Sequence, residues 1–113
     1  MKPNVLHLIN SFHQGGTERQ AVQLVRLLHE SGRFRVHVAC LDAEGVLRPL
    51  VEELGLGEIT EFRLRSFYDR NMLAQSRRCA KLLREREIDV LHTHDFYTNI
   101  FGAAASACTR MPL

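Results

Sequence analysis

The sequence of 113 residues contains few cysteines and no long apolar run. Its three cysteines, Cys40, Cys79 and Cys108, stand far apart and form no C-x-x-C pair. This spacing argues against a disulfide scaffold and against a zinc ribbon. No apolar run approaches the ~18 residues of a membrane-spanning helix, and the first residues, Met1 to Asn4, lead us to expect no secretory signal. Together these absences favour a reducing, cytoplasmic setting.

Two nucleotide-binding patterns are also missing: the glycine pattern G-x-G-x-x-G of dinucleotide-binding domains and the P-loop pattern G-x-x-x-x-G-K-[ST]. Their absence argues against a nicotinamide-dependent enzyme and against an ATPase. Neither sign of charge dominates, since 15 basic and 13 acidic residues leave a formal net charge of +2. That balance does not indicate a nucleic-acid partner. The hydrophobic fraction of 45% is that of an ordinary folded domain.

Short apolar runs alternate with amphipathic stretches along the whole chain. The alternation predicts an α/β fold, a Rossmann-like, doubly wound parallel sheet with helices on both faces. The expected strand order is 3-2-1-4-5, with residues 1–113 forming one partial domain. We expect strands at 4–9, 35–41, 58–64 and 88–93, a fifth beginning at Pro112–Leu113, and helices at 17–31, 46–54, 71–86 and from Thr98 or Asn99 to Cys108.

Ligands of such sheets bind beyond the carboxyl ends of the strands, near the point where the strand order reverses. The loops that follow the first and fourth predicted strands, residues 10–19 and 93–97, end at that edge. In the order 3-2-1-4-5 these two loops are neighbours. We therefore expect them to line one crevice.

Gly15, Gly16 and Thr17 stand between the first predicted strand and the next helix. Thr17 is the expected N-cap of that helix, with Gln20 completing a capping box. Glycines allow close approach of a ligand to the backbone, and free N–H groups of a first helical turn favour an anion such as a diphosphate. The alternative is that the two glycines only make a tight turn.

Glu18 and Arg19 follow in the first turn of the same helix. Arg19 could pair with a phosphate or a carboxylate through two parallel hydrogen bonds. The alternative for both residues is a solvated first turn, in which Glu18 complements the helix dipole.

The segment His92-Thr93-His94-Asp95 is the densest polar cluster of the chain. Alternation places His92 and His94 on the same side of a strand. A metal is not expected, because Phe96 follows where a metallohydrolase pattern needs a further Asp-His pair. We expect His92 to lie in the sheet, and His94 and Asp95 to bind a sugar hydroxyl or assist proton transfer. The other histidines that we expect to be structural or exposed are His7, His29 and His37.

The long helix predicted over residues 71–86 has two distinct faces. Its expected buried face consists of Met72, Cys79, Ala80 and Leu83. The opposite face carries three cations that could contact anionic lipid or a polyanionic acceptor, or could simply be solvated. These cations are Arg77, Lys81 and Arg84.

Two motifs, Gly-Gly-Thr-Glu-Arg at residues 15–19 and Asp-Val-Leu-His-Thr-His at 89–94, resemble the N-terminal half of family 4 glycosyltransferases. That family has the two-domain GT-B architecture, and the resemblance covers nearly the whole chain. It implies retaining transfer of a sugar from a nucleotide-diphospho-sugar to a glycan or lipid-linked acceptor, as in polysaccharide biosynthesis. No metal, other cofactor or nucleic acid is implied. A peripheral contact with the inner face of the cytoplasmic membrane is compatible with such an acceptor.

The resemblance also suggests roles for individual residues. Gly15 and Gly16 would approach the donor diphosphate, with Glu18 and Arg19 at the rim of the same cleft. His94, the candidate catalytic residue, and Asp95 would lie beside the reacting sugar or the acceptor. The expected set that binds donor diphosphate or acceptor is Gly15, Gly16, Thr17, Glu18, Arg19, His94 and Asp95.

The family's nucleotide-binding C-terminal domain has no counterpart in these 113 residues. We therefore expect an acceptor-side fragment that is inactive alone and that self-associates through its incomplete sheet. Two other interpretations stay open: a non-catalytic GT-B half that serves as a binding subunit, and a flavodoxin-like nucleotide-binding domain.

Overall fold

The computed structural model describes residues 2–64 and 70–109. Four strands form one parallel sheet in the order β3-β2-β1-β4, which confirms the predicted α/β class and the order 3-2-1-4. The expected fifth strand at Pro112–Leu113 lies outside the described residues. The elements are β1 (Asn4–Ile9), α1 (Gly16–Ser31), β2 (Arg35–Cys40), α2 (Arg48–Glu52), β3 (Thr60–Glu61), α3 (Arg70–Glu85), β4 (Val90–Thr93) and α4 (Phe96–Thr109).

β1 lies in the middle of the sheet because its apolar side chains are buried on both faces. It is hydrogen-bonded to β2 on one side and to β4 on the other, with His7 opposite both Val38 and His92. The start of the β1–β4 pair is fixed by Asp89, whose carboxylate accepts the backbone N–H of Asn4 at 2.7 Å. The Asp89 N–H in turn donates to the Asn4 carbonyl at 2.8 Å. The aspartate of the Asp-Val-Leu-His-Thr-His motif is thus part of the sheet's register.

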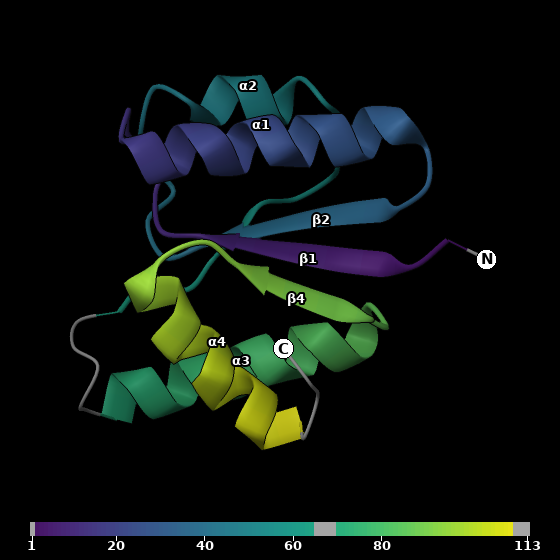
Figure 1. Cartoon of the computed structure of the whole chain (residues 1–113). Coiled ribbons are helices and arrows are strands. Elements are labelled where there is room, and N and C mark those ends of the chain that lie inside the picture. The colour runs from purple at the N-terminus through teal and green to yellow at the C-terminus, as the bar shows by residue number, and fades with distance from the viewer. Residues whose placement is uncertain (1, 65–69, 110–113) are drawn as a thin grey trace.

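The helices form a layer on each side of the sheet: α1 and α2 cover one face, and α3 and α4 cover the other (Figure 1). Alternation along β1 divides the core accordingly, since Leu6 and Leu8 join the α3/α4 side and Ile9 joins the α1/α2 side. Large side chains fill both layers without exposure, notably Phe12 towards α1 and α2, and Phe62 and Phe101 towards α3 and α4. This three-layer arrangement is the predicted doubly wound layout.

Several predicted boundaries are wrong, and local hydrogen bonding explains two of them. α1 begins at Gly16 with Gly15 as N-cap and no side-chain cap, so Thr17 is not the N-cap. The backbone turns earlier because the Gly15 N–H donates to His13 and the Gly15 carbonyl already accepts the N–H of Arg19. α4 begins at Phe96, before the predicted Thr98 or Asn99, because Asp95 caps it.

The two edge strands of the sheet, β3 and β4, are also shorter than predicted. β3 is limited to Thr60–Glu61, because only these residues pair with Ala39 and Cys40. β4 starts at Val90, two residues after the predicted start. α2, at Arg48–Glu52, is likewise shorter than the predicted 46–54. The predicted buried face of α3 is confirmed for Cys79, Ala80 and Leu83, whereas Met72 is only partly buried.

None of the helices in the described part of the chain is long and apolar enough to cross a membrane.

Candidate functional site

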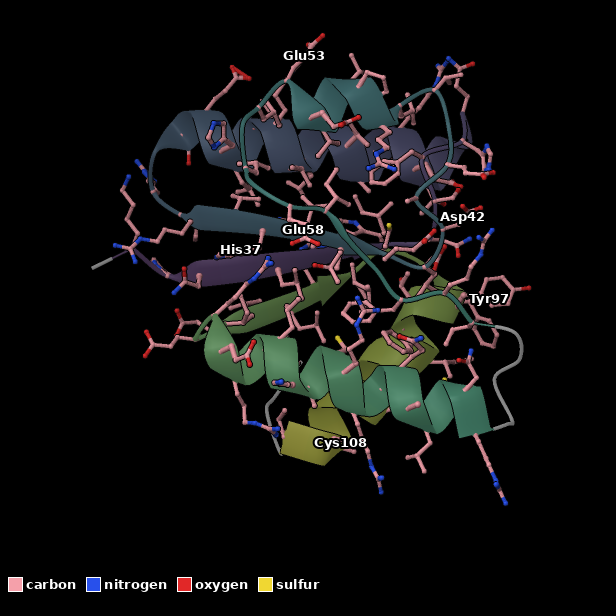
Figure 2. All side chains as sticks on the ribbon, turned by 180° about the vertical axis from the view of Figure 1, so that it is seen from behind. His37, Asp42, Glu53, Glu58, Tyr97 and Cys108 are labelled. Atoms are coloured by element: carbon pink, nitrogen blue, oxygen red, sulfur yellow. The ribbon has the colours of Figure 1, made fainter. Side chains whose placement is uncertain are left out.

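The loops that follow β1 and β4 meet at the carboxyl edge of the sheet, as predicted. Asn10, directly after β1, and Tyr97, in the first turn of α4, line the same cleft of about 250 Å³. Asp42, from the loop after β2, completes its polar wall, and Figure 2 shows Asp42 and Tyr97 at the same end of the molecule. The cleft combines an amide, a carboxylate and an aromatic ring over an apolar floor made by Leu41 and Leu64.

The loop after β1 is held in place by the loop after β2. The Phe12 N–H donates to the Glu44 carbonyl at 3.0 Å, and the Leu47 N–H donates to the Phe12 carbonyl at 2.8 Å. Gly45 permits this approach: its φ is +137°, and a Cβ there would overlap backbone atoms of Phe12 and His13. The position of the loop that leads to α1 therefore depends on a glycine in a different loop.

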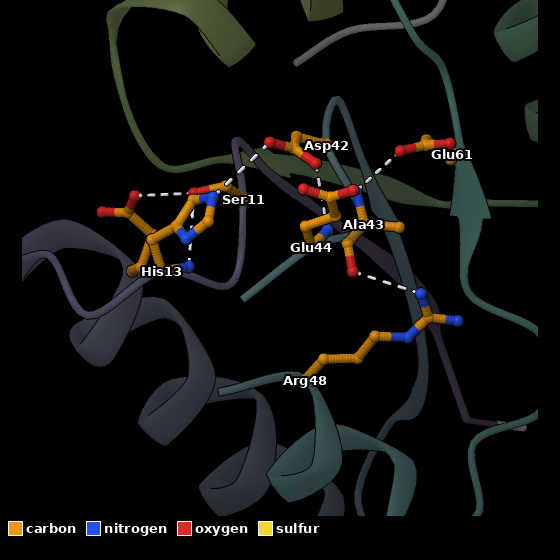
Figure 3. Close-up of polar contacts among 8 residues, drawn as sticks. Ser11, His13, Asp42, Ala43, Glu44, Arg48 and Glu61 are labelled. Atoms are coloured by element: carbon orange, nitrogen blue, oxygen red, sulfur yellow. Dashed lines mark hydrogen bonds and ion pairs between the residues drawn. The ribbon is translucent and has the colours of Figure 1, made fainter. Parts of the chain in front are cut away.

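Polar side chains add a second set of contacts between these loops and β3 (Figure 3). The Ala43 N–H donates to the Glu61 carboxylate at 2.7 Å, and the Arg48 guanidinium donates to the Ala43 carbonyl at 3.1 Å. On the exposed rim, Nε2 of His13 lies 3.6 Å from the Asp42 carboxylate. These contacts hold together the loop after β1, the loop after β2 and strand β3 at the edge of the cleft.

The N-terminus of α1 presents free backbone donors at this edge. No side chain caps it, so the N–H groups of the first turn are available to solvent or to a ligand. A Cβ built on Gly16 meets nothing within 4 Å, which shows that the space in front of Gly16 is open. Thr17 is exposed beside it. A helix N-terminus with this geometry favours an anion.

Glu18 lies back over the loop instead of pointing along the helix surface. Its carboxylate accepts a 2.9 Å hydrogen bond from the Ser11 hydroxyl. A Cβ at Gly15 would lie 2.5 Å from the same carboxylate, so Gly15 makes room for Glu18. The carboxylate complements the positive end of the helix dipole. An incoming anion must therefore share this end of the helix with Glu18 or displace it.

Arg19 is exposed and lines a different hollow, a groove of about 390 Å³ between α1 and α2. The other residues of that groove include Gln14, Arg26 and Glu53. The structure thus brings Gly16 and Glu18 to the end of β1, but it directs Arg19 to the outer face of the α1/α2 layer.

Three histidines from β1 and β4 form one cluster, His7, His92 and His94. His92 lies in β4 opposite His7, and His94 follows directly after the end of β4, so alternation directs both side chains to the face on which His7 lies. The rings of His92 and His94 are stacked, with centroids 4.3 Å apart and planes 7° from parallel. Nδ1 of His7 lies 3.0 Å from Nε2 of His94, so one of these nitrogens donates to the other. The prediction that His92 and His94 share a side of the strand is confirmed.

Burial keeps two of these histidines uncharged near neutral pH. Burial, together with the nearby His94 and His92, lowers the pKa of His7 from 6.5 to about 3. Burial also lowers the pKa of His94 to about 4, helped by His92 and opposed by the Asp95 carboxylate. Each ring therefore carries one N–H donor and one bare acceptor nitrogen at pH 7.

The cluster places one nitrogen of each histidine within 4.8 Å of the others, close enough to consider a metal. Three nitrogens bound to zinc stand about 3.3 Å apart, given Zn–N bonds of about 2.0–2.1 Å and tetrahedral angles. A metal must also lie close to the plane of every ring that binds it. The stacked, nearly parallel planes of His92 and His94 cannot both contain one ion. These ring orientations favour hydrogen bonding within the cluster over coordination.

Asp95 serves first as the N-cap of α4. Its Oδ1 accepts the N–H of Thr98 at 2.8 Å and the Thr98 hydroxyl at 2.9 Å. The Thr98 hydroxyl oxygen accepts the N–H groups of His94 and Asp95 in return. This reciprocal arrangement resembles a capping box, and it fixes the backbone that carries His94. The second carboxylate oxygen, Oδ2, is the one left for a ligand.

Sequence reasoning missed the role of His7, which was expected only to be structural or exposed. A polar residue inside the buried apolar run of β1 was the available signal, together with the predicted neighbourhood of the first and fourth strands. The contribution of Asn10, Asp42 and Tyr97 to the cleft was also missed. The three predicted surface cations of α3 are all exposed, and Lys81 pairs with Glu85 at 3.7 Å.

Comparison with protein families gives one match that spans most of the chain. The model described as Glycosyltransferase Family 4 matches residues 14–113, which include both the glycine motif before α1 and the histidine motif of β4. Comparisons with curated proteins and with solved structures give no significant match. The family match covers far more than half of the sequence, and the parallel α/β sheet agrees with it. The chain therefore belongs to glycosyltransferase family 4.

Proposed function

We propose that the chain is the acceptor-side part of a retaining glycosyltransferase. In this proposal a sugar moves from a nucleotide-diphospho-sugar to a glycan or lipid-linked acceptor at the carboxyl edge of the sheet. The observation that carries the proposal is the location of two unlike features at that edge, the open helix N-terminus at Gly16 and the neutral ring of His94. The family match, which includes both segments, supports it.

The chemistry of sugar transfer suits these features. The diphosphate leaving group gains negative charge as the glycosidic bond breaks, so donors aimed at it act mainly in the transition state. The backbone N–H groups of Gly16 and Thr17, in the uncapped first turn of α1, are such donors, and they need no reorganisation. His94 supplies a neutral hydrogen-bonding group at the same edge of the sheet, and Asp95 offers one carboxylate oxygen.

We propose that the cleft beside Tyr97 receives the acceptor. Asn10 and Asp42 offer groups that can accept and donate hydrogen bonds to sugar hydroxyls, and Tyr97 offers an aromatic wall. The cleft is shallow and open, as an acceptor presented on a longer glycan or a lipid carrier requires. No metal enters this proposal, because the histidine rings are stacked instead of converging on one point.

The donor's nucleotide would be held mainly by a second domain that is not represented in these residues. In this proposal the 113-residue chain does not turn over alone. Exposed apolar side chains in the described residues, among them Leu73 and Val90, supply a surface through which it would self-associate. The proposed compartment is the cytoplasm, with the three cations of α3 in peripheral contact with an anionic membrane surface.

The test replaces Gly16 in the complete enzyme by phenylalanine. A side chain at Gly16 enters open space, so the fold and its unfolding midpoint should not change, but the ring would occupy the place of the diphosphate. We expect kcat/KM to fall by about 100-fold or more, the usual effect of losing oxyanion-type donors. Gln20→Phe, which adds the same ring to an exposed position of the same helix, is the matched control. Unchanged transfer by Gly16→Phe would remove this helix end from the site.

A further inference from the structure

The structure assigns His7 as a positioning residue: through its Nδ1–H it holds His94 in the tautomer that carries its proton on Nδ1. His94 then meets a ligand as a hydrogen-bond donor and not as a base. The assignment rests on the proposed function only for the identity of that ligand. The tautomer itself is a property of this chain.

The first step concerns the contact between the two rings. Nδ1 of His7 and Nε2 of His94 are 3.0 Å apart, the distance of a hydrogen bond. Two bare nitrogens would repel each other, and two N–H groups would clash. Since both rings are neutral near pH 7, only two arrangements remain. Either His7 donates from Nδ1, or His94 donates from Nε2.

The second step uses the other nitrogen of His7. Nε2 of His7 is buried and has no hydrogen-bond partner among the described residues. If His94 were the donor, His7 would carry its proton on Nε2, which would leave a buried N–H without an acceptor. If His7 is the donor, Nε2 is only a bare lone pair. In protein interiors a buried N–H without an acceptor is rarer than a buried acceptor without a donor, so His7 is the donor.

The third step transfers this choice to His94. Its Nε2 accepts from His7 and must be bare, so the single proton of the neutral ring is on Nδ1. Two contacts restrict rotation of the His94 ring. The His92 ring stacks on one side of it, and the Thr98 hydroxyl holds the backbone N–H groups of His94 and Asp95. His94 therefore offers an N–H to a sugar hydroxyl or a phosphate oxygen. Free histidine in water prefers the other tautomer, so the preference must come from His7.

The experiment reads the tautomers directly by long-range ¹H–¹⁵N NMR of the imidazole rings of the 113-residue chain at neutral pH. We expect the wild-type His94 signal to show a protonated Nδ1 and a bare Nε2, and His7 to show the same pattern. His7→Asn keeps an N–H donor at the position of Nδ1 and should leave His94 unchanged. His7→Ala removes the donor and leaves room for a water that can accept from Nε2 of His94, so it should move most of the His94 proton to Nε2.

His29→Gln, near the end of α1 and outside the cluster, is the control and should alter neither ring. A wild-type His94 with its proton on Nε2 overturns the assignment, and so does an Nδ1 proton that persists in His7→Ala. If His7→Ala does not fold, the wild-type and His7→Asn spectra still decide. Absence of glycosyl transfer by the complete enzyme would refute the proposed function without changing these spectra, so the two failures are distinguishable. In an active enzyme, His7→Asn should retain kcat, and His7→Ala should lose it with little change in KM.

Discussion

Replacing Gly45 by alanine should destabilise the protein more than any other glycine-to-alanine change in the described loops. Gly45 has a φ of +137°, which an L-residue adopts only with strain of about 1–3 kcal/mol. A Cβ there would also overlap the Phe12 carbonyl and the His13 nitrogen, both of which are backbone atoms. Since backbone cannot rotate away as a side chain can, the two loops must separate.

Separation of the loops would break the two hydrogen bonds that join Phe12 to Glu44 and to Leu47. Each is worth about 0.5–1.5 kcal/mol. Together with the backbone strain, the expected loss is about 4 kcal/mol in the free energy of unfolding, a large share of the ~5–15 kcal/mol typical of a domain. The assay is urea unfolding followed by far-ultraviolet circular dichroism, with wild type and variant compared at their midpoints.

Gly55→Ala provides the matched control. Gly55 also has a positive φ, +67°, but a Cβ there meets nothing within 4 Å. Its substitution should cost only about 1 kcal/mol, the price of a left-handed backbone. The reasoning fails if Gly45→Ala costs no more than Gly55→Ala, because the close approach of the two loops would then contribute nothing to stability.

Three further predictions concern pH, the cap of α4 and the surface of α3. The pKa values of His7 and His94 are lowered in the folded state, so their contribution to stability is complete above pH 6.5 and is lost as the pH falls towards about 4 and about 3. Between pH 7 and 5 we expect the free energy of unfolding to drop by about 2 kcal/mol because of the buried His7, and by a smaller amount because of the half-buried His94, whose charge water screens. Equal urea midpoints at both pH values would contradict this. Asp95→Ala should lower the free energy of unfolding by about 1–2 kcal/mol, measured by thermal unfolding, whereas Asp95→Asn keeps the hydrogen-bond acceptor and should lower it much less. If both variants lose the same stability, the charge of Asp95 matters and its capping hydrogen bond does not. The third prediction concerns the exposed cations of α3, which are Arg77, Lys81 and Arg84. Replacing all three by glutamine should weaken binding to anionic lipid vesicles about 100-fold, at ~1 kcal/mol per cation. If the wild-type protein does not bind such vesicles at low salt, this face of α3 is only solvated.

Much of the fold could be predicted because local pattern and global packing agree. The apolar run of β1 fits a central parallel strand, and the amphipathic α1 buries Ala21, Val22 and Val25. Gly32 ends α1 with a φ of +70°, the left-handed conformation that glycine adopts most readily. These features depend on residues near one another in sequence, which is why a single sequence reveals them.

The site could be predicted only in outline, because its details depend on contacts between distant segments. Thr17 has the chemistry of an N-cap, but the turn stabilised by His13 starts the helix earlier. His7 acquires its role only from the register that places it opposite His92, 85 residues along the chain. Glu18 is directed by Ser11 and by the absence of a side chain at Gly15. No periodicity in the sequence encodes these pairings.

The most direct test of the central claim is a transfer assay on the complete enzyme with a panel of nucleotide-diphospho-sugars. The stereochemistry of the product would be read by NMR, and wild type would be compared with Gly16→Phe and Gln20→Phe. We predict transfer with retention of anomeric configuration, lost about 100-fold in Gly16→Phe and preserved in Gln20→Phe. Product of inverted configuration, or equal transfer by the wild type and Gly16→Phe, would contradict the claim that sugar transfer occurs at this edge of the sheet.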